Sequence, residues 1–338
     1  MLFLFPLLIL FGLIAAPDAA ARAASEAATL WWTRVFPSLL PYLIASSLLL
    51  QSGLLSRLPN RLVPFLLLPF GILGGYPVGA KLCGRLYRDG ALSLSDAQKC
   101  AVFCNLPNPV FLISVVSAGM FRDARTALPL LIGVFGAALP GLIPLSRPRI
   151  AKCRTAAPSA LAHDLPAAIG DGIRAILNIG GCIVFASVLG SLIEATGVFR
   201  LFGANAPTAR AATLGLFEMT SGVSAIAALP LSLSLRLALA AFFIQFGGMS
   251  VLLQSASFLP LSLPRYCLGK LFLALISSFL TYFLTPLLCP ARTAAAFATG
   301  TELLHNTFDL LAVSLSSVFG LLLIFVFTFG LGRQKRTP

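Results

Sequence analysis

Charged side chains are scarce in this chain. Only 10% of its 338 residues are Asp, Glu, Lys or Arg, 58% are hydrophobic, and the mean hydropathy is +0.95. Soluble domains typically carry about 25% charged residues, so the composition excludes an ordinary soluble protein. It predicts an all-α polytopic membrane protein, because a helix satisfies its own backbone hydrogen bonds in lipid.

Metal-ligating and catalytic side chains are also few. The chain has two histidines, His163 and His305, and seven cysteines without a CxxC pair. This pattern indicates neither a zinc site nor a disulfide framework, and we predict no metal and no other cofactor. Cys100 and Cys104 share a helix face, which we interpret as apolar packing rather than a redox pair. No Ser/His/Asp set is apparent, so we expect no enzymatic activity.

Acidic residues are rarer than basic ones, at 11 against 24, and the formal net charge is +13. In a soluble protein this excess would suggest nucleic acid, but here the basic residues lie in short loops between apolar runs, as the positive-inside rule expects. We therefore expect the lipid bilayer, and no nucleic acid, as a partner. The positive charge would also attract anionic solutes. A homo-oligomer is left open.

Four polar breaks interrupt the apolar runs. We name them the first break (Gly74 to Lys81), the second (Asn105 to Asn108), the third (Glu218 to Gly222) and the fourth (Gln245 to Ser250). Proline and glycine free backbone groups that hydrocarbon cannot satisfy, so such breaks are expected where protein or water surrounds them. The other interpretation of the first break is a tight loop at the membrane surface.

The chain divides into two halves with the same order of apolar segments. We predict an N-terminal membrane helix over 1–24, a first repeat over 25–146, a basic linker over 147–166, a second repeat over 167–288, and a C-terminal helix and basic tail over 289–338. Residues 1–24 lack a basic start, which favours a retained helix over a cleaved signal peptide. A shift of 144 pairs Gly71 with Gly215, and a shift of 140 pairs Asn105 with Gln245 and Asn108 with Gly248.

The charge distribution predicts how these halves are oriented. If 62–88 and 211–229 each enter and leave by one side, and the C-terminus is cytoplasmic, 16 of the 24 Lys and Arg residues lie inside. This favours eight spans plus two re-entrant hairpins, with the halves as inverted repeats. Ten full spans with parallel repeats are the alternative.

Inverted repeats with paired broken helices indicate a transport site near the membrane midplane. Helix N-termini would offer oriented N–H donors to an anion, and carboxamides would add neutral donors and acceptors. The candidate solute-binding residues are Gly74, Gly75, Tyr76, Gly79, Lys81, Asn105, Asn108, Glu218, Thr220, Ser221, Gln245, Gly247, Gly248, Ser250 and Gln254.

Lys81 and Glu218 are the charged residues nearest the predicted centre, where ionised groups are usually functional. Lys81 would neutralise an anionic solute or extend to the cytoplasmic surface with Arg85 and Arg88. Glu218 would bind a coupling cation or proton, or pair with Lys81 across the pseudo-twofold axis.

Five segments resemble the sporulation integral membrane protein YlbJ (SpoVV) family. They are Phe36-Pro37-Ser38-Leu39-Leu40-Pro41-Tyr42, Gly75-Tyr76-Pro77-Val78-Gly79-Ala80-Lys81, Asn105-Leu106-Pro107-Asn108-Pro109, Glu218-Met219-Thr220-Ser221-Gly222 and Phe246-Gly247-Gly248-Met249-Ser250. The resemblance covers about residues 25 to 288. It implies a nucleoside-recognition Gate domain, related to segments of concentrative nucleoside and ferrous-iron transporters.

What the resemblance implies is passage of dipicolinic acid, a small aromatic dicarboxylate, across the outer forespore membrane during endospore formation. The expected solute is therefore a small carboxylate. Two alternatives remain: a transporter whose solute is a nucleoside, and a membrane scaffold for spore maturation that transports nothing.

Overall fold

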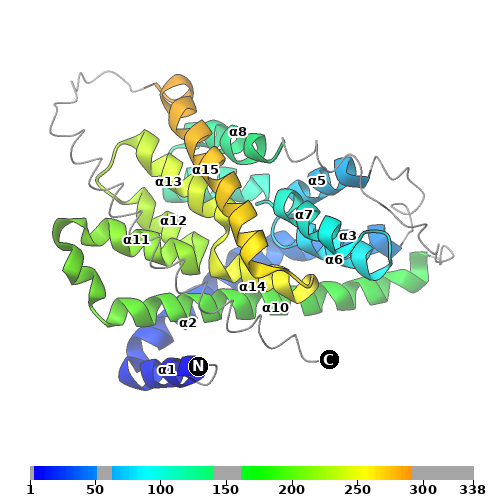
Figure 1. Cartoon of the computed structure of the whole chain (residues 1–338), viewed down its shortest axis with the longest axis horizontal. Helices are drawn as coiled ribbons and strands as arrows, with labels where there is room; N and C mark the ends of the chain where they lie inside the picture. The colour runs from blue at the N-terminus through cyan, green and yellow to red at the C-terminus, as the bar shows by residue number, and fades with distance from the viewer. Residues whose placement is uncertain (1–3, 52–62, 140–160, 291–338) are drawn as a thin grey trace.

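The computed structural model describes residues 4–51, 63–139 and 161–290, which are helical without a strand, so the predicted all-α class is confirmed there (Figure 1). The elements are α1 (Leu4–Ala15), α2 (Pro17–Leu30), η1 (Trp31–Val35), α3 (Phe36–Gln51), α5 (Val63–Gly74), α6 (Val78–Arg88), α7 (Leu94–Cys104), η2 (Phe111–Met120), η3 (Ala124–Thr126), α8 (Ala127–Ala138), α10 (Leu161–Ala195), η5 (Val198–Asn205), α11 (Ala206–Phe217), α12 (Met219–Ala227), α13 (Leu233–Phe246), α14 (Gly248–Phe258) and α15 (Leu263–Leu288). Residues 147–160 of the predicted linker and the predicted C-terminal helix lie outside the described residues.

The same order of elements occurs twice. In the first half, the helical stretch α2, η1 and α3 precedes two interrupted pairs, α5–α6 and α7–η2, and α8 follows. In the second half, α10 precedes the interrupted pairs α11–α12 and α13–α14, and α15 follows. Each of the four predicted breaks therefore interrupts a helix, at the segment that its glycines, prolines and polar residues indicate.

Two predicted boundaries differ from the structure. The helix predicted over 1–24 is divided at Ala16, where the chain bends by 100°. The reason is Pro17, which has no N–H to continue α1 but suits the first position of α2. α2 then crosses the predicted boundary at residue 24. At the other boundary, α10 begins at Leu161, so the predicted linker over 147–166 ends inside a helix.

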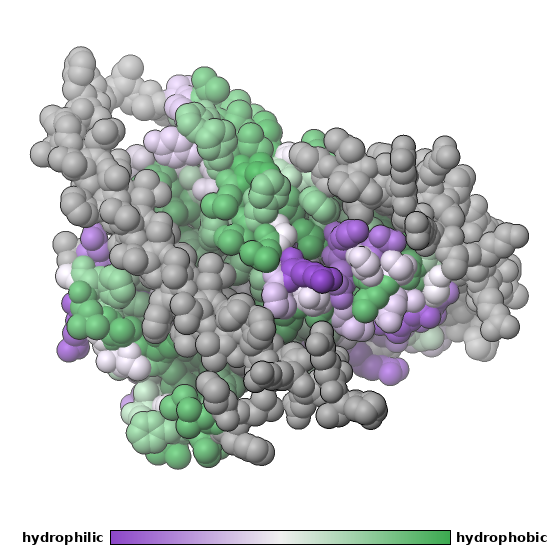
Figure 2. Space-filling view, in the orientation of Figure 1, coloured by the Kyte–Doolittle hydropathy of each residue, from purple (hydrophilic) through white to green (hydrophobic). Residues whose placement is uncertain are grey.

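Several helices are suited to a membrane. Three described stretches are long and apolar enough to span one, namely Leu165–Ala195, Leu233–Phe258 and Leu263–Leu288, and α1 with α2 and η1 makes a fourth if that bent pair is one span. Figure 2 shows hydrophobic surface over α15 and α8, with polar residues gathered near α6 and the start of α15. The outer face of α15 carries Leu268, Phe272, Leu275, Phe279, Phe283 and Leu287.

Corresponding long helices of the two halves run antiparallel. α10 lies first against α3 and then against η1, and α15 lies along α8 in the opposite direction. The contacts that give this order are Gly172 with Ile44, Gly180 with Trp31, Gly133 with Thr281, and the Cys289 thiol with the Arg125 carbonyl oxygen. Glycine allows the close approach at three of these four positions, because a Cβ there would meet the neighbouring helix.

The pairs α5–α6 and α11–α12 each fold back on themselves. A Cβ on Gly71 or on Gly79 would lie 1.8 or 2.2 Å from the same atom, the Cys104 carbonyl oxygen. In one straight helix these two glycines would be about 12 Å apart, so the chain must turn between them. In α11–α12, a Cβ on Gly222 would lie 2.1 Å from the Gly215 Cα. Both pairs are therefore helical hairpins.

The fourth break has a different form. α13 and α14 together make one span over Leu233–Phe258, and this is the most buried of the three spans. Gly247 and Gly248 at its interruption have φ values of 86° and 67°. Residues with a Cβ rarely adopt this backbone conformation, so the two glycines interrupt the helix while its two parts remain one span.

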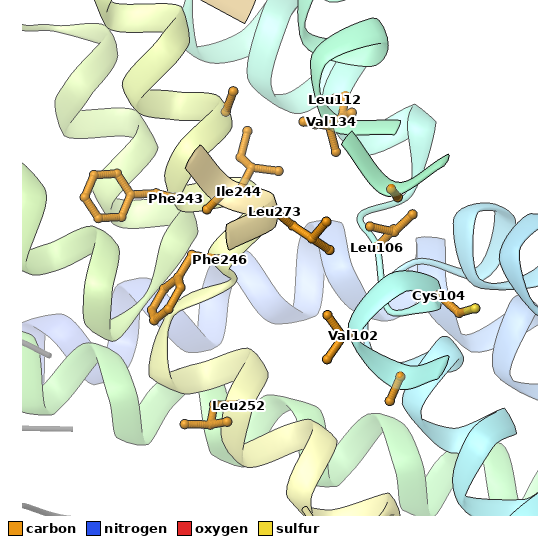
Figure 3. Packing of buried hydrophobic residues seen from close by; sticks show 14 of the residues in the cluster. Val102, Cys104, Leu106, Leu112, Val134, Phe243, Ile244, Phe246, Leu252 and Leu273 are labelled. Atoms are coloured by element: carbon orange, nitrogen blue, oxygen red, sulfur yellow. The ribbon is translucent and has the colours of Figure 1, made fainter. Parts of the chain in front are cut away.

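The hydrophobic core joins both halves around the breaks. Figure 3 shows Leu273 of α15 between Ile244 of α13 and Leu106 of the second break, with Val102 and Cys104 of α7 beside them. All five side chains are buried in one cluster. The breaks therefore lie in the packed interior, where each polar group needs a protein partner or a ligand.

Candidate functional site

Asn105 fixes the second break to three other elements. Its Nδ2 donates to the Ser255 hydroxyl of α14 at 2.8 Å and to the Tyr266 hydroxyl of α15 at 3.0 Å. Its Oδ1 accepts the Ala80 N–H of α6 at 3.4 Å. Since the side chain is fully buried and both carboxamide atoms are bonded, Asn105 is a structural hub in this arrangement.

The first break contacts the second break and the end of α13, directly before the fourth break. The Tyr76 hydroxyl donates to the Ile244 carbonyl oxygen near the end of α13, at 2.7 Å. The Asn108 Nδ2 donates to the Leu73 carbonyl oxygen at the end of α5, and Gly75, at a φ of 73°, lies directly against Asn108. The Tyr76–Pro77 peptide bond is cis. Gly74 and Gly79 also serve close packing, because a Cβ on Gly74 would meet the Val78 side chain and a Cβ on Gly79 would meet the Cys104 carbonyl group.

Lys270 was not among the predicted site residues, yet it lies at this junction. Its Nζ donates to the Asn105 carbonyl oxygen and lies 5.3 Å from the centroid of the Tyr76 ring. The side chain is 1% exposed. The sequence carries a signal for this residue, because Lys270 falls inside the apolar run 263–288, where an ionisable side chain is rare.

In the third break, Glu218 caps its own helix. The carboxylate accepts the Ser221 N–H at 2.7 Å and the Ser221 hydroxyl at 3.0 Å, at the start of α12. Glu218 and Thr220 are buried. Among the residues that the structure describes, no salt bridge joins Glu218 to Lys81. The predicted pairing of these two residues is therefore absent from this arrangement.

A capping role predicts how Glu218 tolerates substitution. Glu218→Gln keeps an oxygen for the Ser221 N–H, so we expect a small loss of stability, whereas Glu218→Ala should lose about 1 kcal/mol, as N-cap deletions do. Thermal unfolding of the purified protein in detergent measures both. Equal losses in the two variants would show that the charge, rather than the cap, is what the fold requires.

The fourth break holds polar groups without partners. Both carboxamide atoms of Gln245 and the Ser250 hydroxyl are buried and form no hydrogen bond in the described part of the chain. Gln254 is also buried, at 3% exposure. Gln245 is the residue that the shift of 140 pairs with Asn105, so the two positions differ: Asn105 is bonded within the protein, and Gln245 is free to bond to something else.

Gly248 and Asn108, which the same shift pairs, make corresponding contacts. Asn108 bonds to a carbonyl at the end of α5. Gly248 faces carbonyls at the end of α11, where a Cβ on it would lie 2.9 to 3.3 Å from the oxygens of Gly215, Leu216 and Phe217. Asn108 therefore packs on the end of α5, and Gly248 packs on the end of α11. In each half, this is the first helix of the hairpin that precedes the residue.

A cavity of about 410 Å³ lies beside the first break, between α3, α6, α10 and α14. Its size is typical of small-molecule sites. Lys81 is its buried basic residue, at 8% exposure, and the Lys81 Nζ donates to the Ser47 hydroxyl at 2.7 Å and to the Leu43 carbonyl oxygen at 3.3 Å. The lining residues are Ser47, Lys81, Arg85, Arg88, Asp171, Arg174, Ala175, Asn178, Ser257 and Phe258.

The cavity is strongly basic. Lys81, Arg85 and Arg88 lie on one face of α6, Arg174 faces them from α10, and Asp171 is the acidic residue among the lining side chains. Arg85 is half exposed and pairs with Asp89 at 3.0 Å. Of these residues, only Lys81 is predicted from the sequence, because the α10 residues, some 90 positions away, have no local signal that they meet α6.

The predicted site residues thus form two groups. Tyr76, Asn105 and Asn108 join the first and second breaks, with Tyr76 also reaching the end of α13. Lys81 points away from them into the basic cavity. Glu218, Thr220 and Ser221 belong to the α11–α12 hairpin, and Gln245 to Ser250 belong to the α13–α14 interruption.

The fold and these interior polar breaks define a class: a multi-pass, all-helical integral membrane protein with interrupted helices. Within that class, the chain is similar to sporulation integral membrane protein YlbJ of Bacillus subtilis (strain 168), with 28% identity over 293 residues that cover 73% of this chain and 72% of the relative. This similarity supports the resemblance that the motifs indicate. No protein-family profile matches the chain, and no solved structure matches it.

Proposed function

We propose that this protein, rather than being an enzyme, carries a small organic anion across a membrane, with dipicolinic acid as the solute that its family resemblance implies. The observation that carries the proposal is the basic cavity around Lys81. The relative's description as a sporulation integral membrane protein is consistent with a role in spore formation. The Gate domain and the outer forespore membrane are part of the same proposal.

The chemistry of the cavity supports an anion. An ammonium group has three donors, and the structure shows two acceptors on the Lys81 Nζ, from Ser47 and Leu43. The third donor is available to a carboxylate. Arg88 and Arg174 lie on two different helices around the same space, which suits a solute with two separated carboxylates, because a guanidinium binds a carboxylate through two parallel hydrogen bonds.

The arrangement of the halves supports inverted repeats. A twofold axis in the membrane plane makes corresponding helices antiparallel, as α10 is to α3 and α15 is to α8, whereas parallel repeats would align them. The folded α5–α6 and α11–α12 pairs favour eight spans and two re-entrant hairpins over ten full spans. The proposed orientation has the C-terminus in the cytoplasm, on the side where the charge count places Lys81, Arg85, Arg88 and Arg174.

One observation favours a second candidate, a nucleoside. Gln245 and Ser250 offer buried, neutral hydrogen-bonding groups without partners, and such groups discriminate strongly between solutes with and without matching hydroxyls. If these residues bind the solute, a neutral nucleoside would be preferred to a dicarboxylate. In that case Lys81 would not bind the solute, and its role would be limited to packing and to the positive charge of the cavity.

Flux into proteoliposomes tests the proposal. The purified full chain should give saturable uptake of labelled dipicolinate above protein-free liposomes, and excess unlabelled uridine should leave that uptake unchanged. Uptake of labelled uridine without any uptake of dipicolinate would establish the nucleoside alternative. Absence of flux for both, together with co-purification of spore-maturation proteins, would favour the scaffold.

A further inference from the structure

Lys270 is a basic residue inside an apolar span, and it does not line the cavity around Lys81 that we propose to bind the solute. α15 covers Leu263–Leu288 and is apolar enough to cross a membrane, yet the Lys270 side chain is 1% exposed and cannot reach solvent. Ionised groups at such positions are costly and are usually functional. The contacts of its ammonium group indicate the role of Lys270.

The groups facing Lys270 are a backbone carbonyl oxygen and an aromatic ring rather than a carboxylate. The Nζ donates to the Asn105 carbonyl oxygen, at the C-terminal end of α7 where the helix dipole is negative. It also lies 5.3 Å from the centroid of the Tyr76 ring, within reach of a cation–π interaction. Titratable side chains beside it are Tyr76 and Cys104, and Tyr266 lies one helical turn earlier on α15. In the described ranges no carboxylate forms a salt bridge with it.

These contacts connect the first and second breaks and extend to the end of α13. Lys270 bonds to the second break through Asn105 and contacts the first through Tyr76, whose hydroxyl in turn bonds to Ile244 just before the fourth. The Asn105 side chain extends the network to Ser255 of α14. The ammonium group of Lys270 on α15 thus bonds to the second break, which lies 165 residues earlier in the chain.

We propose that Lys270 is a positioning residue: its ammonium group holds the first and second breaks together in the arrangement seen here. It acts beside the direct bonds of Asn105 to Ala80 and of Asn108 to Leu73, so that the breaks separate only when the ammonium group also releases the Asn105 carbonyl oxygen. Without Lys270, the carbonyl loses its charged donor and the Tyr76 ring loses its cation. The two breaks would then open more often, independently of whether any solute is bound.

Hydrogen exchange of the purified full chain in lipid nanodiscs, read by mass spectrometry, tests this without transport. In Lys270→Met, peptides covering 75–81 and 103–108 should exchange about tenfold faster or more, because a hydrogen bond to a charged group is lost at a local opening. Lys270→Arg, which keeps the charge, should restore protection. Lys99→Met, at an exposed lysine of α7, should leave both peptides unchanged.

Two results would overturn the proposal: unchanged exchange in both peptides of Lys270→Met, or an equal increase in peptides of α8, which would mean general loosening. If Lys270→Met does not fold, Lys270→Gln decides, since it keeps a donor for the Asn105 carbonyl but no charge. It should raise exchange in the same two peptides, and unchanged exchange would again reject the proposal.

Uptake adds the functional consequence, which rests on the proposed function. Lys270→Met should change the maximal rate of dipicolinate uptake while leaving the half-saturating concentration within about twofold, because Lys270 lies outside the solute cavity. If wild-type protein gives no uptake, the transport proposal fails while the exchange result still stands. An altered half-saturating concentration with an unchanged maximal rate would instead place Lys270 at the solute.

Discussion

Lys81→Met is expected to lower dipicolinate uptake at least tenfold while the protein remains folded. Lys81 is the buried basic residue of the cavity, held by Ser47 and Leu43 with one donor left over. Loss of a charged hydrogen bond to the solute corresponds to about 1.5–3 kcal/mol, or roughly 10- to 150-fold in binding. Methionine keeps the length and the apolar stem, so packing changes little. Initial uptake rates over a range of dipicolinate concentrations measure the effect.

Two matched variants separate a specific contact from a general positive field. Arg85→Met removes a charge from the same cavity, but Arg85 is half exposed and already paired with Asp89, so the loss should stay within about threefold. Lys99→Met removes an exposed charge elsewhere and should not change uptake. Equal losses for Lys81 and Arg85 would indicate electrostatic attraction alone, and normal uptake in Lys81→Met would remove Lys81 from the site.

Local chemistry explains which features could be predicted from the sequence. α15 ends at Leu288, where the predicted second repeat over 167–288 ends, because the apolar run that forms this helix stops there in the sequence. The breaks at Gly75 to Pro77 and at Gly247 were predictable for a similar reason, since glycine and proline act on the backbone at their own positions. Pro17 carried the same signal, and the division at Ala16 followed from it.

Long-range contacts explain what could not be predicted. Nothing near Lys270 in the sequence shows that its ammonium group meets Asn105 and Tyr76, and nothing near Gln245 shows that its carboxamide lacks partners while that of Asn105 is fully bonded. Whether α11–α12 crosses or folds back was left open for the same reason. The contact between Gly215 and Gly222 decides the shape of that pair in space.

That contact gives the second large prediction: Gly222→Ala should destabilise the protein severely. The new Cβ would lie 2.1 Å from the Gly215 Cα and 2.3 Å from its N, and both neighbours are backbone atoms that cannot rotate away. The hairpin must open to admit the methyl group, and overpacking of this kind costs on the order of 3 kcal/mol. Thermal unfolding in detergent, followed by size-exclusion chromatography of the folded fraction, measures the loss.

Gly181→Ala is the matched control, because it adds the same methyl group within helix α10 at a position where, in the described part of the chain, no atom beyond the adjacent residues and the helix's own backbone lies within 4 Å of the new Cβ. Alanine is a better helix former than glycine by about 1 kcal/mol, so this variant should be as stable as the wild type or slightly more so. If Gly222→Ala behaved like Gly181→Ala, then α11 and α12 would not be packed against each other. The pair would then be free to cross the membrane as separate spans, which returns the ten-span, parallel arrangement and removes the re-entrant hairpin from the proposed transport mechanism.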